Sequence, residues 1–143
     1  MDFKFSKEAQ RLFEEAALFA ERNLAGRAVS GFDTTGWRLL ADFGAFRQAS
    51  ARQATSGLGA IETAAMLEGL GRGGADRGLL FAAGAHLFGC LTPLVRYGTQ
   101  AQIEAWEPSL RDGTAIGALA VTEADGRSAS PTFAAVSRRP QGP

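Results

Sequence analysis

A helical period in the first 24 residues constrains the fold most strongly. From Ser6 to about Leu24, apolar residues recur at the i, i+3, i+4, i+7 spacing of one helix face, and Glu and Arg residues occupy the other face. Ser6 can cap this helix, and Glu8 lies in the first turn, where a negative charge favours the helix dipole. The pattern predicts an amphipathic helix whose apolar face must be covered by other elements.

Further helical segments follow, separated by glycine, proline and capping residues. The sequence predicts five or six helices in all. After the first, they are a short helix around Trp37 to Phe46 interrupted near Gly44, a helix from Ala60 to about Leu70, an apolar helix from an Asp76 cap to about Gly89, a short helix from Thr92 and Pro93 to Gly98, and a helix opened by a Thr99 and Gln102 capping box that ends near Pro108.

The composition changes after the last predicted helix. Residues 115–121 are compact and apolar and predict a first strand, and a second short strand is expected around residues 132–136. We therefore divide the chain into a helical domain, residues 1–114, and the start of a β domain with a frayed tail, residues 115–143. A lone strand has unpaired backbone groups on both edges. This mainly α fold is thus expected to need another chain or further sequence to complete its sheet.

Composition and charge exclude several classes of protein. Apolar residues make up 45% of the 143-residue chain, and fifteen basic residues balance fifteen acidic ones, so no electrostatic footprint for nucleic acid is present. The single cysteine, Cys90, cannot form an internal disulfide, and residues 1–7 lack the order of a secretory signal, so we expect a cytoplasmic protein. The longest apolar stretch, residues 79–95, is interrupted by glycine, histidine, threonine and proline, which argues against a membrane span.

Candidate catalytic and cofactor residues are few. A G-x-G-x-x-G pattern at Gly69, Gly71 and Gly74 closes a helix instead of following a strand, so helix termination is the favoured interpretation over a phosphate loop. His86 is the only histidine, and it fits a core residue better than a metal ligand or a catalytic base. Cys90 lies in an apolar run and is expected to be an inert buried thiol. The sequence therefore identifies no metal site and no catalytic residue.

The end of the predicted first strand carries polar groups. Glu123 and Asp125 are close together, but solvated loop charges are the favoured interpretation over an acid/base pair. The hydroxyl of Thr122, beside free backbone N–H groups at a strand end, could bond the polar edge of a heterocyclic ring.

Several stretches, taken in order, resemble the N-terminal region of acyl-CoA dehydrogenases. The most specific is A-V-T-E-A-D-G-R-S at residues 120–128, preceded by L-R-D-G-T-A-I-G at residues 110–117. The others are F-S-K-E-A-Q-R-L-F at 5–13, F-A-E-R at 19–22, L-E-G-L-G-R at 67–72 and Y-G-T-Q-A-Q at 97–102. The resemblance covers nearly the whole chain.

The resemblance implies a helical domain leading into a small β domain that binds FAD. Leu119, Val121 and Thr122 would then face the pyrimidine side of the flavin, and Ser128 would approach the thioester arm of an acyl-CoA substrate. Such contacts hold and tune a flavin ring. Where the family has Ala-Gly-Ser-Asp, this chain has Gly126, Arg127, Ser128 and Ala129. Arg127 could pair with a CoA phosphate or obstruct the loop.

Three functional interpretations follow from this resemblance. The first is a fragment or split subunit of an acyl-CoA dehydrogenase-like flavoprotein, an oxidoreductase inactive by itself because the C-terminal domain with the family's catalytic glutamate has no counterpart here. A homo- or hetero-oligomer would then supply the missing β and helical parts. The second is a helical interaction module derived from the family, without cofactor or enzymatic activity. The third is a truncated product.

Overall fold

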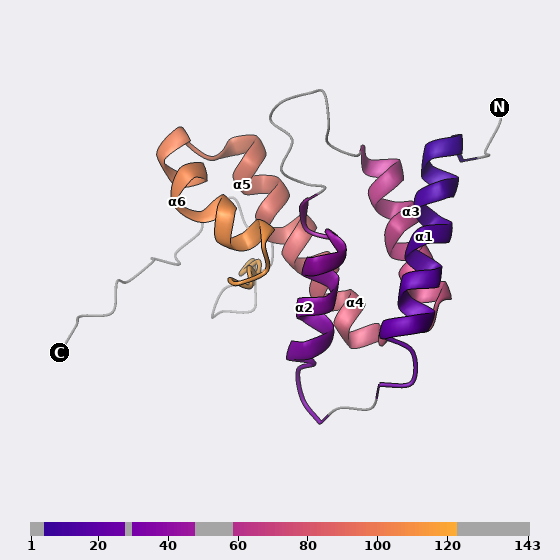
Figure 1. Cartoon of the computed structure of the whole chain (residues 1–143). Coiled ribbons are helices and arrows are strands. Elements are labelled where there is room, and N and C mark those ends of the chain that lie inside the picture. Colours follow the sequence, from indigo (N-terminus) through magenta and orange to yellow (C-terminus); the bar gives the residue numbers. More distant parts are fainter. Residues whose placement is uncertain (1–4, 28–29, 48–58, 123–143) are drawn as a thin grey trace.

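The chain folds into a mainly helical domain, as the sequence predicts (Figure 1). In the computed structural model, the structure describes residues 5–27, 30–47 and 59–122. Their elements are α1 (Lys7–Asn23), α2 (Thr34–Phe43), α3 (Ala60–Arg72), α4 (Arg77–Gly84), the π-helix η2 (Ala85–Leu91), α5 (Thr92–Tyr97) and α6 (Gln100–Arg111). Because α4, η2 and α5 form one uninterrupted run, the described residues contain five helical bodies.

Side-chain caps start the helices where the sequence predicted them. The hydroxyl of Ser6 accepts the N–H of Ala9 at the start of α1, and the Asp76 carboxylate accepts the N–H of Leu79 at the start of α4. At the start of α6, Thr99 and Gln102 form a complete capping box. Each cap satisfies a backbone donor that has no partner within its helix. These local signals are confirmed.

Helices α1 and α3 pack side by side at very short range (Figure 1). The contact face of α1 carries alanines, of which Ala16 and Ala20 are fully buried. A Cβ atom added to Gly69 would overlap the carbonyl oxygen of Phe13, and one added to Gly73 would overlap that of Ala17. The glycines of this region thus allow close helix packing and, at Gly73, end α3. Of the glycine pattern, Gly69 and Gly71 lie within α3, and only Gly74, with a φ of +89°, follows its end, so helix termination is confirmed for Gly74 alone.

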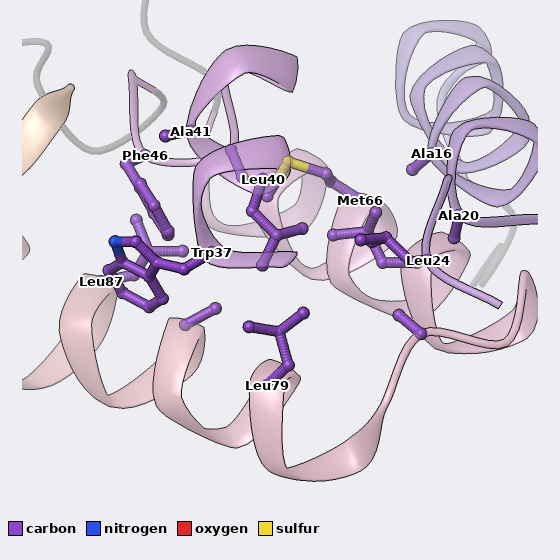
Figure 2. Packing of buried hydrophobic residues seen from close by; sticks show 14 of the residues in the cluster. Ala16, Ala20, Leu24, Trp37, Leu40, Ala41, Phe46, Met66, Leu79 and Leu87 are labelled. Carbon is purple, nitrogen blue, oxygen red and sulfur yellow. The ribbon is translucent and has the colours of Figure 1, made fainter. Parts of the chain in front are cut away.

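The core lies where α2 meets the long helical run and α3. Figure 2 shows Leu40 of α2 and Leu79 of α4 pointing toward each other, with Met66 of α3 beside them. Leu40 and Met66 are fully buried, and Leu79 nearly so. Burying side chains of this size contributes about 1.5–3 kcal/mol each. The core therefore fixes α2 against α3 and against the long helical run that starts with α4.

The helical run from Arg77 to Tyr97 corrects two expectations. A new helix was predicted to begin at Thr92, but the chain continues without a break through Pro93, which lies in the first turn of α5. In an α-helix, the ring of proline clashes with the carbonyl four residues earlier, and its missing N–H leaves that carbonyl without a donor. The wider π-turn of η2 relieves both problems.

The interruptions that argued against a membrane span therefore do not break the helix. The run of 21 residues is long and apolar enough to cross a membrane by length and composition alone. Its buried side chains, Leu79, Ala83, Leu87, Leu91 and Val95, belong to the core of the domain. A core helix of a folded domain has the same length and composition.

Two further expectations differ from the structure near the end of the helical domain. Helix α6 passes through Pro108 and ends at Arg111. Proline has no N–H to donate to the carbonyl of Glu104, but Glu104 is exposed, so water can reach this carbonyl. The strand predicted for residues 115–121 is absent from the described residues. Their backbone is irregular, and only Thr122 forms a single β-bridge. A strand requires a neighbouring strand for its backbone hydrogen bonds, and the described part of the helical domain offers none to these residues.

Candidate functional site

The candidate site lies where the chain leaves the helical domain. We call residues 113–122 the exit segment. It follows α6 and runs past η2 and α2 before it reaches the residues that resemble a flavin-facing sequence. Its first part is fixed by contacts with buried side chains, and its last part is exposed.

His86 is the side chain that joins three of these elements. It lies on η2 and is fully buried. Its Nε2 lies 2.9 Å from the carbonyl oxygen of Leu110, at the end of α6, and its Nδ1 accepts the backbone N–H of Gly117 at 2.9 Å. Because an N–H group can only donate, Nδ1 carries no proton, so Nε2 must carry it and donate to Leu110. The two partners therefore fix a neutral imidazole in one tautomer.

Aromatic rings enclose the His86 imidazole. The ring of Phe46 lies 4.7 Å and that of Trp37 5.1 Å from it, centroid to centroid, both in edge-on geometry. Burial among these rings lowers the pKa of His86, and the carbonyl of Leu110 opposes that effect only in part. The hydrogen bond from the Gly117 N–H also favours the neutral form of His86, because Nδ1 can accept this bond only when it carries no proton. The histidine is therefore held neutral, which confirms it as a core residue.

The exit segment begins at a glycine that no other residue could replace without strain. Gly113 has a left-handed φ of +74°, and its carbonyl oxygen accepts the indole N–H of Trp37 at 2.9 Å. A Cβ atom at Gly113 would lie 2.7 Å from the Cβ of Ala41. This glycine thus lets the backbone approach α2 and turn toward His86.

Two glycines bring the exit segment onto η2. Gly117 packs so closely on Cys90 that a Cβ atom there would overlap its Sγ. Conversely, a Cβ atom at Gly89 would lie 3.0 Å from the Cβ of Leu119. Burial raises the pKa of the Cys90 thiol, so it stays protonated near neutral pH. Cys90 is half-buried and not fully buried as the sequence predicted, but its raised pKa keeps it a weak nucleophile.

Three of the four predicted site residues lie at the end of the exit segment. The side chain of Leu119 is 62% exposed, Val121 is half-buried and Thr122 is exposed. Among the described residues, the backbone groups of residues 118–121 form no hydrogen bond with another element. The N–H and C=O groups of residues 118–120, which have no partner among the described residues, suit the polar edge of a flavin together with the Thr122 hydroxyl. Ser128 lies outside the described residues, as do Glu123, Asp125 and Arg127.

A groove of about 620 Å³ borders the exit segment on its other side. Trp37 and Ile116 form apolar walls, and its rim carries Arg38, Asp42 and Asp112. Charges of both signs select neither an anion nor a cation, so this groove defines no ligand class. Within the described residues, no three His, Cys, Asp or Glu side chains are grouped to hold a metal ion.

The chain belongs to the acyl-CoA dehydrogenase family. The family described as "Acyl-CoA dehydrogenase, N-terminal domain" matches residues 6–114, from the cap of α1 to the start of the exit segment. The resemblance drawn from the sequence motifs is thereby confirmed, and the fold is that of the N-terminal helical domain.

The similar curated proteins are dehydrogenases named for two kinds of substrate. An L-prolyl-[peptidyl-carrier protein] dehydrogenase from Serratia sp. is 35% identical over 87% of this chain and 34% of its own length. A protein of the same name from Pseudomonas fluorescens is 31% identical over 91% of this chain and 35% of its own. The mitochondrial isovaleryl-CoA dehydrogenase of Pongo abelii is 33% identical over 82% of this chain and 29% of its own. The chain thus spans about one third of the length of these relatives.

Solved structures show the same relationship. The structure titled "PigA with FAD and proline" matches 87% of this chain and 34% of that one, with a TM-score of 0.74 and 35% identity. The prolyl acyl carrier protein oxidase AnaB matches 85% of this chain and 34% of its own, with a TM-score of 0.71 and 30% identity. At these values the helical arrangement is shared.

The contacts that fix the exit segment were not foreseen from the sequence. His86 lies 24 residues from Leu110 and 31 from Gly117, so no local spacing connects them. The available signal was a single histidine within an apolar run, together with two glycines in L-R-D-G-T-A-I-G. These features indicate burial and close backbone approach, but not which partners meet.

Proposed function

We propose that this chain supplies the helical domain and the first flavin-facing segment of an FAD-dependent dehydrogenase that acts on a thioester-bound acyl group. The observation that carries the proposal is the exit segment itself. It is fixed at Gly113 and Gly117, and it then presents the exposed side chains of Leu119 and Thr122 on either side of the half-buried Val121. Such a fixed start followed by an exposed end suits a cofactor edge.

Within the proposed site, each residue group has a distinct role. Backbone groups of Leu119 and Val121 would pair with the polar edge of the flavin ring, and the hydroxyl of Thr122 would add a donor or acceptor there. When bound, FAD supplies the chemistry by accepting the hydride removed from the substrate. No side chain of the described residues is placed to act as the base, so the proton acceptor would come from the remaining parts of the enzyme.

The substrate class is supported by the relatives. The first two are named for a prolyl group on a peptidyl-carrier protein, and others are named for isovaleryl-CoA. Both are acyl groups held as thioesters on a phosphopantetheine arm. The carrier-protein dehydrogenases match more of this chain, 87% and 91% against 82%, and the Serratia protein is the most identical of the three at 35%. This favours a carrier-bound substrate over free acyl-CoA, which the sequence motifs alone suggested.

A chimera tests the proposal. Residues 6–122 of this chain would replace the matching third of the Serratia relative, and the flavin content of the purified protein would be measured from its visible absorption. We expect the chimera to retain flavin, and we expect Thr122→Ala to weaken its retention. Thr35→Ala, which removes an exposed hydroxyl from α2 outside the exit segment, is the matched control. A folded chimera that stays colourless in excess FAD would refute the proposal.

A further inference from the structure

We propose that His86 is a positioning residue for the flavin-facing end of this chain, holding Gly117 through a neutral imidazole of one fixed tautomer. The flavin-facing role of residues 119–122 rests on the proposed function, but the positioning contact itself does not. His86 touches neither the exposed end of the segment nor any reacting atom. It acts through the backbone of Gly117.

The place of Gly117 in the exit segment makes this contact decisive. The segment is held at four residues. Gly113 accepts from Trp37, Thr114 donates to Asp112 and to the carbonyl of Ser109, Ala115 donates to the same carbonyl, and Gly117 donates to His86. Gly117 is the last of these residues along the described chain, and Leu119 follows only two residues later. The direction in which residues 119–122 leave the domain is therefore set at Gly117.

An apolar side chain of similar size could fill the same space without positioning the segment. It would leave the part-buried N–H of Gly117 without its acceptor, and the carbonyl of Leu110 would keep only the N–H of Gly113, at 3.3 Å, as a donor. Only a side chain with a donor and an acceptor on opposite edges satisfies both. Imidazole in the Nε2–H tautomer has this arrangement, and its flat ring fits between Trp37 and Phe46.

The π-helix places the ring at this point. In η2 the wider turn carries His86 on the same side as Gly89 and Cys90, the two residues on which Gly117 and Leu119 pack. A π-turn inserted into an α-helix is often found where a side chain must be aimed. The histidine, the two glycines and the cysteine thus form one contact surface for the segment.

Charged neighbours do not account for the neutral state of His86. The titratable residues on the elements that pack around it are Cys90 on η2, Arg77 on α4, Arg96 and Tyr97 on α5, Arg38 and Asp42 on α2, Arg47 after α2, and Glu104, Glu107, Arg111 and Asp112 on α6 and its end. Burial lowers the pKa of His86 and the Leu110 carbonyl opposes that effect in part, with no ionic contribution. Protonation of Nδ1 would remove the acceptor for Gly117, so acid should release the exit segment.

A scalar coupling across the hydrogen bond tests the contact in the full chain without flavin. In a uniformly ¹⁵N-labelled sample at neutral pH, the amide nitrogen of Gly117 should show a through-bond correlation with Nδ1 of His86, the only histidine in the chain. Nε2 should carry the proton. A correlation of Gly117 with no imidazole nitrogen, or a proton on Nδ1, would overturn the proposal.

Two isosteric variants separate positioning from packing. The Oδ1 atom of His86→Asn takes the place of Nδ1 and can still accept from Gly117, whereas the amide nitrogen of His86→Gln takes the place of Nε2 and can still donate to Leu110. We expect hydrogen exchange of the Gly117 amide to stay within about threefold of the wild type in the Asn variant. In the Gln variant it should rise about tenfold. Equal exchange in two variants of equal global stability would contradict a positioning role.

The same pair of variants in the chimera connects the contact to flavin. We expect His86→Gln to release FAD about tenfold more readily than His86→Asn, because only the former frees Gly117. Equal FAD release from the two variants would show that the position of the segment does not matter for flavin. A wild-type chimera without flavin would instead refute the proposed function and leave the nitrogen coupling result standing.

Discussion

The indole N–H of Trp37 donates to the carbonyl oxygen of Gly113 at 2.9 Å, across 76 residues of sequence. The same indole packs on Phe46 and stands edge-on to His86. One side chain of α2 thus supports both the start of the exit segment and the histidine that holds its middle. The helical domain and the segment are therefore expected to form one cooperative unit.

Replacing Trp37 with Phe should destabilise the chain by about 1–3 kcal/mol, because it removes the donor to Gly113 and part of a nearly buried ring. Urea unfolding followed by circular dichroism measures this change. Trp106→Phe is the matched control, since that ring is 60% exposed, and it should change stability by less than about 0.5 kcal/mol. Equal effects of the two substitutions would contradict the described contact.

Replacing Gly69 with Ala should cost about 1–3 kcal/mol or more, because the new methyl group would meet the backbone of α1 at Phe13. Gly84→Ala is the control, since Gly84 lies in α4 and a Cβ atom there would meet nothing within 4 Å. That change should be neutral or stabilise by up to about 1 kcal/mol. Thermal unfolding of both variants decides the point, and a neutral Gly69→Ala would refute the close α1–α3 packing.

Asp33 both caps α2 and pairs with Arg27. Its Oδ1 accepts the N–H of Gly36 at 2.8 Å, and its two oxygens face Nη2 and Nε of Arg27 at 3.0 and 2.9 Å. Asp33→Ala should destabilise the chain by about 2 kcal/mol. Asp33→Asn keeps the capping oxygen and should cost less. The ordering of the two variants in urea unfolding checks this, and an equal loss would argue against a separate capping contribution.

The Arg27 guanidinium and the Gly36 N–H lower the pKa of Asp33 to about 2. The unfolded chain binds a proton at its ordinary value of 3.8, so stability from this group is present above that pH and is lost as the pH falls toward 2. Wild type should therefore lose more stability than Asp33→Asn between pH 4 and about 2. Parallel acid titrations of the two proteins, followed by circular dichroism, measure the difference.

His86 should give the chain a second pH dependence, at higher pH. Its pKa is lowered in the folded state, so below its ordinary value of 6.5 the unfolded chain binds a proton that the folded chain does not. The free energy of unfolding should thus fall as the pH drops from about 6.5 toward 5, with a slope that corresponds to the uptake of up to one proton on unfolding. His86→Asn should remove this dependence, because the chain has no other histidine. A slope unchanged by the substitution would contradict a neutral, buried His86.

The helix starts could be predicted because their signals are local. Ser6, Asp76 and Thr99 each lie three residues before the backbone N–H that they cap, a spacing visible in the sequence. The family motifs then located the segment that faces the proposed flavin. Local chemistry and motif order together gave the helical domain and its relation to acyl-CoA dehydrogenases.

The contacts that make the site could not be predicted in the same way. Continuity through Pro93 depends on the π-turn of η2, and α6 continues past Pro108 because an exposed carbonyl tolerates the lost hydrogen bond. The strand expected at residues 115–121 is replaced by irregular backbone that His86 holds at Gly117. In each case tertiary packing decides what local propensity leaves open.

The central claim is that this chain presents one face of a flavin site that other parts of the enzyme complete. The most direct measurement is the visible absorption spectrum of the purified 143-residue chain, before and after adding the separately produced remaining two thirds of the Serratia relative together with FAD. We predict a colourless chain that acquires one flavin per complex on mixing. Stoichiometric flavin on the chain alone, or a stable complex that remains colourless, would contradict the account.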